Sequence, residues 1–145
     1  MGDDGKTYKV PADMTYNQWY NKYIDLKPVG EGTWKVDTEG RIVPTVQITD
    51  KGHFKPKTKS KPNDVIVHYE RNGQRDYDIY DSHGFMTMQI HCGDHGFPKT
   101  HPYGIKGEHM AVWKWEHKNG KWIGKPTGNQ ELTPQAREWV KDALY

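Results

Sequence analysis

Two Asn-Gly pairs, each lying between segments of β-prone residues, constrain the fold of this chain more than any other feature of its sequence. The first pair, Asn72-Gly73, separates residues 65–71 from residues 74–80. Because Asn-Gly readily adopts the two positive φ angles of a type I′ turn, the pattern predicts a β-hairpin with a two-residue connection. In the register that this connection predicts, Glu70 lies opposite Arg75 and His68 lies opposite Tyr77.

The second pair, Asn119-Gly120, predicts another hairpin between residues 110–117 and residues 121–124. Between the two hairpins, a turn over residues 81–84 leads into a third predicted strand over residues 85–91. Alternation in this strand is typical of a sheet with one buried face, so we expect His91 on the polar face. The apolar positions are Met86, Met88 and Ile90, and the polar positions are Thr87, Gln89 and His91.

Helices are predicted at both ends of the chain. Thr15 precedes Gln18 by three residues, as in a capping box, and apolar residues follow at helical spacing, which predicts a helix over residues 16–25. Thr133-Pro134 predicts the start of a C-terminal helix. Its expected apolar stripe consists of Ala136, Trp139, Val140, Ala143 and Leu144.

The expected fold class is therefore α+β: an antiparallel β meander with N- and C-terminal helices and a His-rich irregular loop. We expect residues 1–30 to form an N-terminal linker and helix, and residues 31–145 to form a single α+β domain. Eighteen aromatic residues can build its core although only 33% of the chain is hydrophobic.

Composition excludes several classes of protein. The net charge of +2 is too small for a domain-wide nucleic-acid surface, so any nucleic-acid contact must be local. A single cysteine, Cys92, rules out an intrachain disulfide. No run approaches the roughly 18 apolar residues of a membrane span. The first ten residues lack the basic-then-apolar pattern of a signal peptide, so we expect neither a signal peptide nor a membrane segment.

Histidines are concentrated in one part of the chain. Six of the eight lie between His83 and His117, and residues 91–109 also contain Asp94, Lys99 and Lys106. Imidazoles exchange protons near neutral pH, lysines bind anions, and a carboxylate can orient a ring by accepting its N–H. Loops on a rigid sheet often carry catalytic residues. This stretch therefore predicts a phosphoryl-transfer site.

Other residues are expected to assist such a site or to be structural. Residues 51–62 hold five lysines and no acidic residue, which predicts an irregular loop. The candidates for binding substrate phosphates are His91, Lys106, Lys55 and Lys57. The histidines expected to be structural are His53, His68, His83 and His117.

A metal site is the main chemical alternative. His91, Asp94 and His95 offer suitable ligands for a divalent metal ion. Their spacing matches no closed structural zinc pattern, and the HExxH motif is absent. Asp94-His95 followed by Pro98 is similar to the first half of a His-Asn-His nuclease motif, but the second half has no clear counterpart.

Two parts of the sequence resemble known families. Residues 13–23, DMTYNQWYNKY, are similar to a segment near the end of the head-morphogenesis (MuF-type) domain of phage minor capsid proteins. A second set resembles the C-terminal domains of bacterial polymorphic toxins and of MuF-linked effectors. This set consists of Arg75-Asp-Tyr-Asp78, then Asp94-His95-Gly96-x-Pro98-x-x-His101-Pro102, then His109 and Trp113.

The resemblance implies a nuclease-like toxin effector of a phage or prophage that acts on RNA and has a cognate immunity protein. It also implies a protein that is virion-associated or delivered into the cytoplasm of a target bacterium. The pattern associated with such domains ends in His-x-His-x-Trp, whereas residues 109–113 read His-Met-Ala-Val-Trp. Alternation along a strand would place a histidine at position 111 beside His109. Ala111 is then either a natural loss or an inactivating substitution.

Three hypotheses of function remain open. The first is a metal-independent endoribonuclease toxin that needs no cofactor, in which His95 and His109 act as base and acid. In it, His101 and Lys99 stabilise the developing charge, and Asp94 orients a ring. The second is a metal-dependent nuclease that uses His91, Asp94 and His95. The third is a non-catalytic virion structural or adaptor module whose aromatic residues bind a protein.

Overall fold

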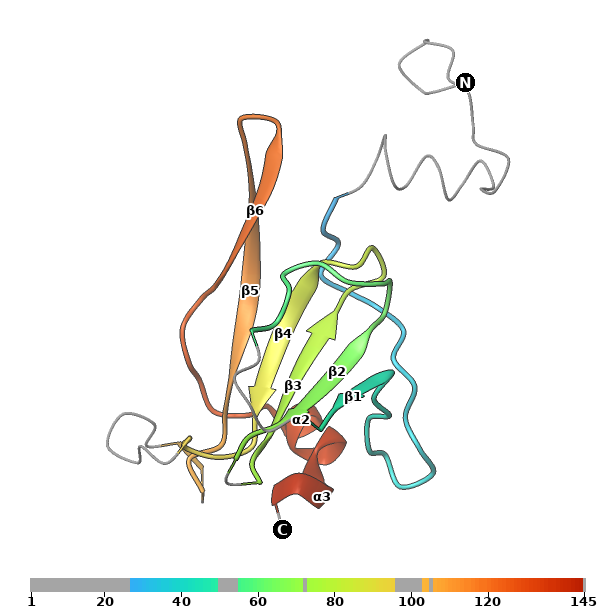
Figure 1. Cartoon of the computed structure of the whole chain (residues 1–145), viewed down its shortest axis with the longest axis vertical. Coiled ribbons are helices and arrows are strands. Elements are labelled where there is room, and N and C mark those ends of the chain that lie inside the picture. Colours follow the sequence, from blue (N-terminus) through green and yellow to red (C-terminus); the bar gives the residue numbers. More distant parts are fainter. Residues whose placement is uncertain (1–26, 50–54, 72, 96–102, 105, 145) are drawn as a thin grey trace.

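The computed structural model describes residues 27–49, 55–71, 73–95, 103–104 and 106–144, so the helix predicted over residues 16–25 lies outside them. A six-stranded sheet in the order β1-β2-β3-β4-β5-β6 forms the centre of the fold, and two short helices follow it in sequence (Figure 1). The strands are β1 (Val46–Ile48), β2 (Val65–Tyr69), β3 (Arg75–Tyr80), β4 (Met86–His91), β5 (His109–Lys118) and β6 (Lys121–Pro126). The helices are α2 (Pro134–Trp139) and α3 (Lys141–Leu144).

The first strand makes the sheet mixed. β1 pairs with β2 in parallel, from Val46 opposite Ile66 to Ile48 opposite His68, whereas the other neighbouring strands pair antiparallel. The predicted antiparallel meander is therefore wrong at β1 and holds from β2 to β6. A parallel pair needs a crossover connection rather than a tight turn, and residues 49–64 separate these two strands. The broader α+β class stands.

The first hairpin forms where the sequence predicts it, but in a different register. His68 lies opposite Asp76 and Tyr69 lies opposite Arg75. The predicted pairs Glu70–Arg75 and His68–Tyr77 are therefore wrong by one residue. Such a shift exchanges the two faces of a strand relative to its neighbour. Asp76 consequently shares a face with His68.

The cause of the shift is a connection of three residues, 71–73, instead of two. The Glu70 N–H donates to the Gln74 carbonyl, and the Gly73 N–H donates to the Glu70 carbonyl. Gly73 has a φ of +87°. A three-residue hairpin loop commonly ends in such a left-handed residue. A glycine at the end of the loop suits both connections, so the sequence pattern does not separate them.

The second hairpin confirms its prediction. Asn119 and Gly120 have φ angles of +51° and +73°, and Lys118 lies opposite Lys121, as a type I′ turn requires. β4 pairs with only the first residues of β5, from His109 to Val112. The remainder of β5 projects with β6 beyond the other strands as a two-stranded ribbon (Figure 1). We call this ribbon, residues 113–126, the arm.

The C-terminal helices and one face of the sheet enclose the core. Thr133 caps α2 by accepting the Ala136 N–H, and Pro134 follows it, as predicted. The predicted single helix is divided, because Val140 departs from helical geometry between α2 and α3. The core consists of Ile42, Val65, Val67, Tyr77, Ile79, Ile90, Cys92, Met110, Leu132, Ala136, Val140 and Leu144.

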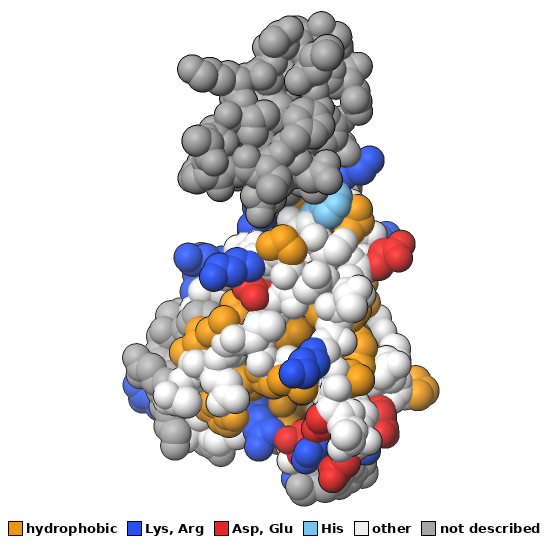
Figure 2. Space-filling model, turned by 90° about the vertical axis from the view of Figure 1, so that its right-hand side faces the viewer, with side chains coloured by type: hydrophobic (Ala, Val, Ile, Leu, Met, Phe, Trp, Pro, Cys, Tyr) orange, Lys and Arg blue, Asp and Glu red, His pale blue; other side chains and the backbone are white. Residues whose placement is uncertain are grey.

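The buried carboxylate of Asp81 ties the chain before β1 to the predicted turn over residues 81–84. Its Oδ2 accepts the N–H groups of Val29 and Gly30, and its Oδ1 accepts those of His83 and Phe85. On the side of the molecule that carries the segment before β1, hydrophobic side chains lie across the middle and charges of both signs gather at the lower end (Figure 2). The described residues on this side form no surface of a single charge.

Candidate functional site

The face of the sheet opposite the helices carries polar side chains in rows that cross neighbouring strands. His68 on β2, Asp76 on β3, His91 on β4 and His109 on β5 lie directly opposite one another in turn. Directly opposite residues point to the same face, so these four side chains form one row. The next row consists of Ile66, Asp78, Gln89 and Ala111.

Three of the predicted histidines converge at one end of the first row. The ring centroids of His91 and His95 are 4.8 Å apart, those of His91 and His109 are 5.0 Å apart, and those of His95 and His109 are 5.2 Å apart. His91 ends β4, His109 begins β5, and His95 lies in the loop after β4. Ring nitrogens at these separations can reach one reacting group. We call these three residues the histidine cluster.

Gln74 fixes both the backbone and the ring of His95. The Gln74 Oε1 accepts the His95 N–H at 2.9 Å. The Gln74 Nε2 then donates to Asp76 Oδ1 at 2.8 Å and faces His95 Nδ1 at 3.0 Å. His95 has a φ of +57°, an unusual backbone conformation for a residue other than glycine. The contacts with Gln74 hold the residue in this conformation and direct its ring toward the cluster.

Glu70 contacts the same nitrogen of His95. Its Oε2 lies 2.6 Å from His95 Nδ1, so one proton must lie between these two atoms. Burial, together with the hydrogen bond to Asp76 and the charge of Asp76, raises the pKa of Glu70 to about 8. The Gln74 amide nitrogen can only donate, so Nδ1 is the accepting nitrogen of His95, and the single proton of a protonated Glu70 is shared between its neighbours His95 Nδ1 and Asp76. His95 then carries its proton on Nε2, the nitrogen that is not occupied by these two partners.

A second carboxylate lies beside His91. His91 Nδ1 is 3.2 Å from Asp76 Oδ1. Burial acts to raise the pKa of Asp76, but the hydrogen bond and charge of His91, with hydrogen bonds from Glu70 and Gln74, outweigh it and lower the pKa. Asp76 is therefore ionised at neutral pH, and its negative charge lies beside the His91 ring. In the next row, burial raises the pKa of Asp78 to about 6.

His109 is held in the opposite tautomer from His95. It is 2% exposed, and its Nδ1 lies 2.8 Å from the Gly107 carbonyl. A carbonyl only accepts, so Nδ1 carries the proton and Nε2 carries a lone pair in the neutral ring. The ring of Tyr103 lies 6.0 Å from the His109 ring. The cluster thus combines one imidazole arranged to donate a proton with one arranged to accept a proton.

The other predicted site residues are placed differently. Asp94 is half-buried and precedes His95 in the sequence, and Glu70 and Asp76 add two carboxylates that contact rings of the cluster. Lys106 is exposed, and its backbone N–H donates to the carboxylate of Glu108. Lys99 and His101 lie outside the described residues.

The two candidates from the lysine-rich loop lie along a different part of the sheet. Lys55 and Lys57 are exposed. The Lys57 carbonyl accepts the Tyr80 hydroxyl, and the neighbouring Thr58 carbonyl accepts the Met86 N–H. The backbone of Lys57 therefore lies at the start of β4, whereas His91 lies at the end of that strand. The structure does not bring this backbone to the histidine cluster.

Ala111 lies next to the cluster on the same face. It is 5% exposed and pairs with Gln89. This pair is two residues along the strands from the His91–His109 pair and therefore lies on the same face. Gln89 donates to Asp78 Oδ1 and accepts the indole N–H of Trp113. A larger side chain at position 111 would therefore point into the polar row.

Glu70, Gln74 and Asp76 are not among the site residues predicted from the sequence. All three reach His95 or His91 only because the first hairpin has a three-residue connection. The available signal was the density of polar residues around this turn, including the Asp76 of the Arg75-Asp-Tyr-Asp78 segment. The predicted register would have turned that carboxylate to the other face.

The histidine cluster also has the donor set of a metal site. Nitrogens of His91, His95 and His109 lie within 4.8 Å of one another, and a second group joins Glu70, Asp76 and His95. A metal bound to an imidazole lies near the plane of the ring. The rings of His91 and His109 are stacked, with an angle of 3° between their planes. Sharing one ion would therefore require one of these two rings to rotate.

Comparisons with protein-family models, with curated proteins and with solved structures give no match for this chain. Within the described part of the chain, neither helix has the length and apolar content to cross a membrane. The case for a function therefore depends on the geometry of the histidine cluster and its carboxylates.

Proposed function

We propose that this chain is a polymorphic-toxin effector of a phage or prophage and that its histidine cluster cleaves RNA without a metal ion. The observation that carries this proposal is the pair of complementary imidazoles, His95 and His109, whose ring centroids are 5.2 Å apart. RNA cleavage through the 2′-hydroxyl requires one group that removes a proton and another that supplies one. A correctly placed acid or base contributes roughly 10²–10⁴ in rate.

His109 is the general base in this proposal. Its Nε2 lone pair takes the proton of the 2′-hydroxyl, and the O2′–P bond forms as the P–O5′ bond breaks. The leaving O5′ takes the Nε2 proton of His95, which is the general acid. The proton of Glu70 moves to His95 Nδ1 and keeps the ring neutral. The products are a 2′,3′-cyclic phosphate and a 5′-hydroxyl, and solvent restores both protons.

His91 stabilises the negative charge on the phosphorane-like transition state. In this role the His91 ring would carry both ring protons, with the carboxylate of Asp76 3.2 Å from its Nδ1, because a fixed positive charge aimed at developing negative charge lowers a barrier. Lys99 and His101 lie outside the described residues, and their role in stabilising this charge stays a prediction from the sequence. The parallel rings of His91 and His109 favour proton transfer over a shared ion.

A metal-assisted nuclease is the second candidate, because three ring nitrogens lie within 4.8 Å of one another. A bound cation would activate water for attack on phosphorus. This mechanism predicts linear rather than cyclic phosphate products and loss of activity with a chelator.

The test uses an RNA oligonucleotide and two proteins, the chain itself and its Ala111→His variant, each with EDTA and with added Mg²⁺ or Zn²⁺. We expect the variant to cleave in EDTA with a cyclic phosphate product and faster than the chain itself, which Ala111 leaves weakly active or inactive, because the imidazole restores the His-x-His-x-Trp pattern beside His109. Adding His109→Ala should lower its rate by at least 10². The matched control is His83→Ala, since His83 lies in the turn before β4, at the other end of that strand from His91.

Two results would overturn the proposal. One is a folded Ala111→His protein that cleaves no RNA with or without divalent cations. The other is cleavage that stops with EDTA and yields no cyclic phosphate, which would select the metal-assisted mechanism. Toxicity on expression in bacteria, relieved by a cognate immunity protein, tests the effector role separately.

A further inference from the structure

The arm has two chemically different faces. Cross-strand pairs place Trp113 with Pro126, Trp115 with Gly124, and His117 with Trp122 on one face. The alternate positions form the opposite face, which contains the pairs Lys114–Lys125, Glu116–Ile123 and Lys118–Lys121. We call the first the aromatic face and the second the basic face.

Contacts with the sheet fix the aromatic face. The indole N–H of Trp113 donates to Gln89 Oε1, and that of Trp115 donates to the Met86 carbonyl. Trp115 lies against Gly124, where a Cβ atom would approach the ring to 2.6 Å. At the far end, the rings of His117 and Trp122 are 4.8 Å apart. The polar atoms of two indoles are already satisfied, and Trp113, Trp115 and Trp122 are half-buried, so each leaves part of its ring exposed to a ligand.

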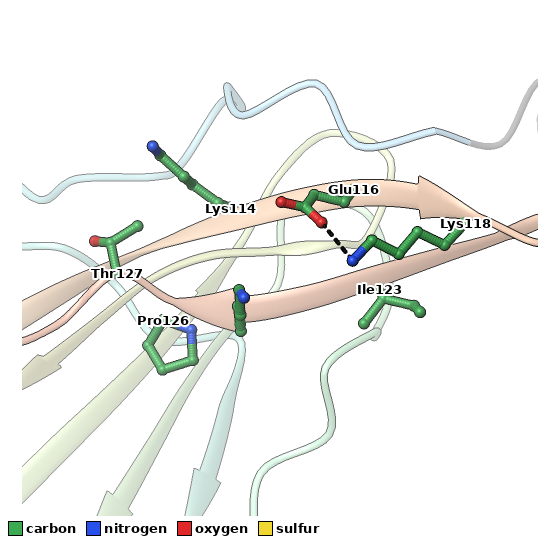
Figure 3. Close-up of a pocket in the computed structure, with 7 residues that line it drawn as sticks. Lys114, Glu116, Lys118, Ile123, Pro126 and Thr127 are labelled. Atoms are coloured by element: carbon green, nitrogen blue, oxygen red, sulfur yellow. Dashed lines mark ion pairs between the residues drawn. The ribbon is translucent and has the colours of Figure 1, made fainter.

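The basic face supplies positive charge. Residues 112–127 contain four lysines and one acidic residue, Glu116, in a chain whose total net charge is only +2. Glu116 pairs with Lys118 at 3.1 Å (Figure 3). Lys114, Lys118, Ile123 and neighbouring residues line a groove of about 370 Å³ (Figure 3). The ribbon is only two strands wide, so a phosphate at either edge of it lies next to both faces and is attracted by the lysines.

The aromatic face continues directly into the histidine cluster. Residues 109, 111, 113, 115 and 117 lie along one face of β5. At the rise of a β-strand, Trp113 is about 13 Å from His109 along this strand, and Trp115 is about 20 Å away. A chain held on these rings would be aligned with the cluster.

We propose that the arm binds single-stranded RNA, with bases stacked on the aromatic face and phosphates attracted by the lysines, and that it delivers the strand to the histidine cluster. Aromatic rings interleaved with positive charge are the features by which proteins hold single strands without reading their sequence. The delivery part of this inference rests on the proposed function, whereas binding by the arm does not.

The experiment measures binding of a fluorescent 2′-O-methyl oligouridine, which cannot be cleaved through its 2′-oxygen, by fluorescence anisotropy. We expect Trp122→Ala to weaken binding at least fivefold, because one base–aromatic stack is lost. Trp122→Leu should also weaken binding, because it keeps an apolar side chain but removes the ring on which a base stacks. The matched control is Ile123→Ala, which removes a 52% exposed side chain from the basic face of the same strand. Binding should also weaken with rising salt, less steeply after Lys121→Gln.

Equal effects of Trp122→Ala and Ile123→Ala would overturn the proposal, and so would failure of the oligonucleotide to bind. An arm that binds polyglutamate but no oligonucleotide would instead identify an acidic protein partner. Cleavage of a dinucleotide, which is too short to reach the arm from the histidine cluster, tests the proposed nuclease activity separately from binding by the arm. Suppose that binding depends on Trp122 but neither the chain nor its Ala111→His variant cleaves the dinucleotide. This result would support RNA binding by the arm and overturn the proposed nuclease activity.

Discussion

A carboxyl group that keeps its proton in the folded state contributes most to stability at low pH. The pKa of Glu70 rises from 4.5 to about 8, and that of Asp78 rises from 3.8 to about 6. Between the ordinary and the raised pKa of each group, the folded state holds a proton that the unfolded state has lost. The free energy of unfolding therefore falls as pH rises through this range. The lowered pKa of Asp76 acts in the other direction, below its ordinary value of 3.8. The two effects therefore occupy separate ranges of pH.

We expect Glu70→Gln to flatten the decline of the melting temperature between about pH 5 and 8, measured by scanning calorimetry. The amide can still donate to His95 Nδ1, so the fold should persist while the proton supply of the proposed acid is lost. Glu39→Gln, at a side chain that is 65% exposed, is the control and should keep the slope of the parent chain. An unchanged slope in Glu70→Gln would contradict a raised pKa for Glu70.

Among the strands, the length of each turn sets the register and therefore which side chains lie opposite one another. The turn at Asn119-Gly120 could be predicted to the residue, because both residues have the positive φ angles that the pair favours, whereas its two strands are longer than predicted. The first hairpin could not, because Gly73 serves a two-residue and a three-residue connection equally well. The parallel β1 had no local signal, since its partner β2 is separated from it by residues 49–64.

Gly73→Ala should lower the free energy of unfolding by about 1–2 kcal/mol, the cost of a left-handed conformation for a residue with a Cβ. A Cβ atom at this position meets nothing within 4 Å, so the cost is conformational rather than steric. Gly73→Asn should lose less, because asparagine tolerates this conformation. Urea denaturation of the three proteins measures the difference. Equal stability of the alanine variant and the parent chain would contradict the observed loop.

The two faces of the sheet differ in what they contact. One face packs on α2 and α3 to form the core, and the other carries the polar rows and the histidine cluster. The histidines of this site could be predicted from their density in residues 91–109. Glu70 and Gln74 could not, because their position depends on a register that the sequence leaves open.

The stability of the whole fold should not depend on a metal ion. The chain has one cysteine, and the stacked rings of His91 and His109 do not converge on one ion. We expect treatment with a chelator to leave the melting temperature unchanged, with zinc well below one equivalent by elemental analysis. Stoichiometric zinc together with unfolding on its removal would identify a metal-stabilised protein instead.

β5 runs without interruption from His109, inside the polar face, to Lys118 at the tip of the arm. The proposed base and the tip of the arm are therefore parts of one continuous strand. A protein that inhibits the proposed activity can in that case bind the arm as well as the histidine cluster, because both lie on the same element.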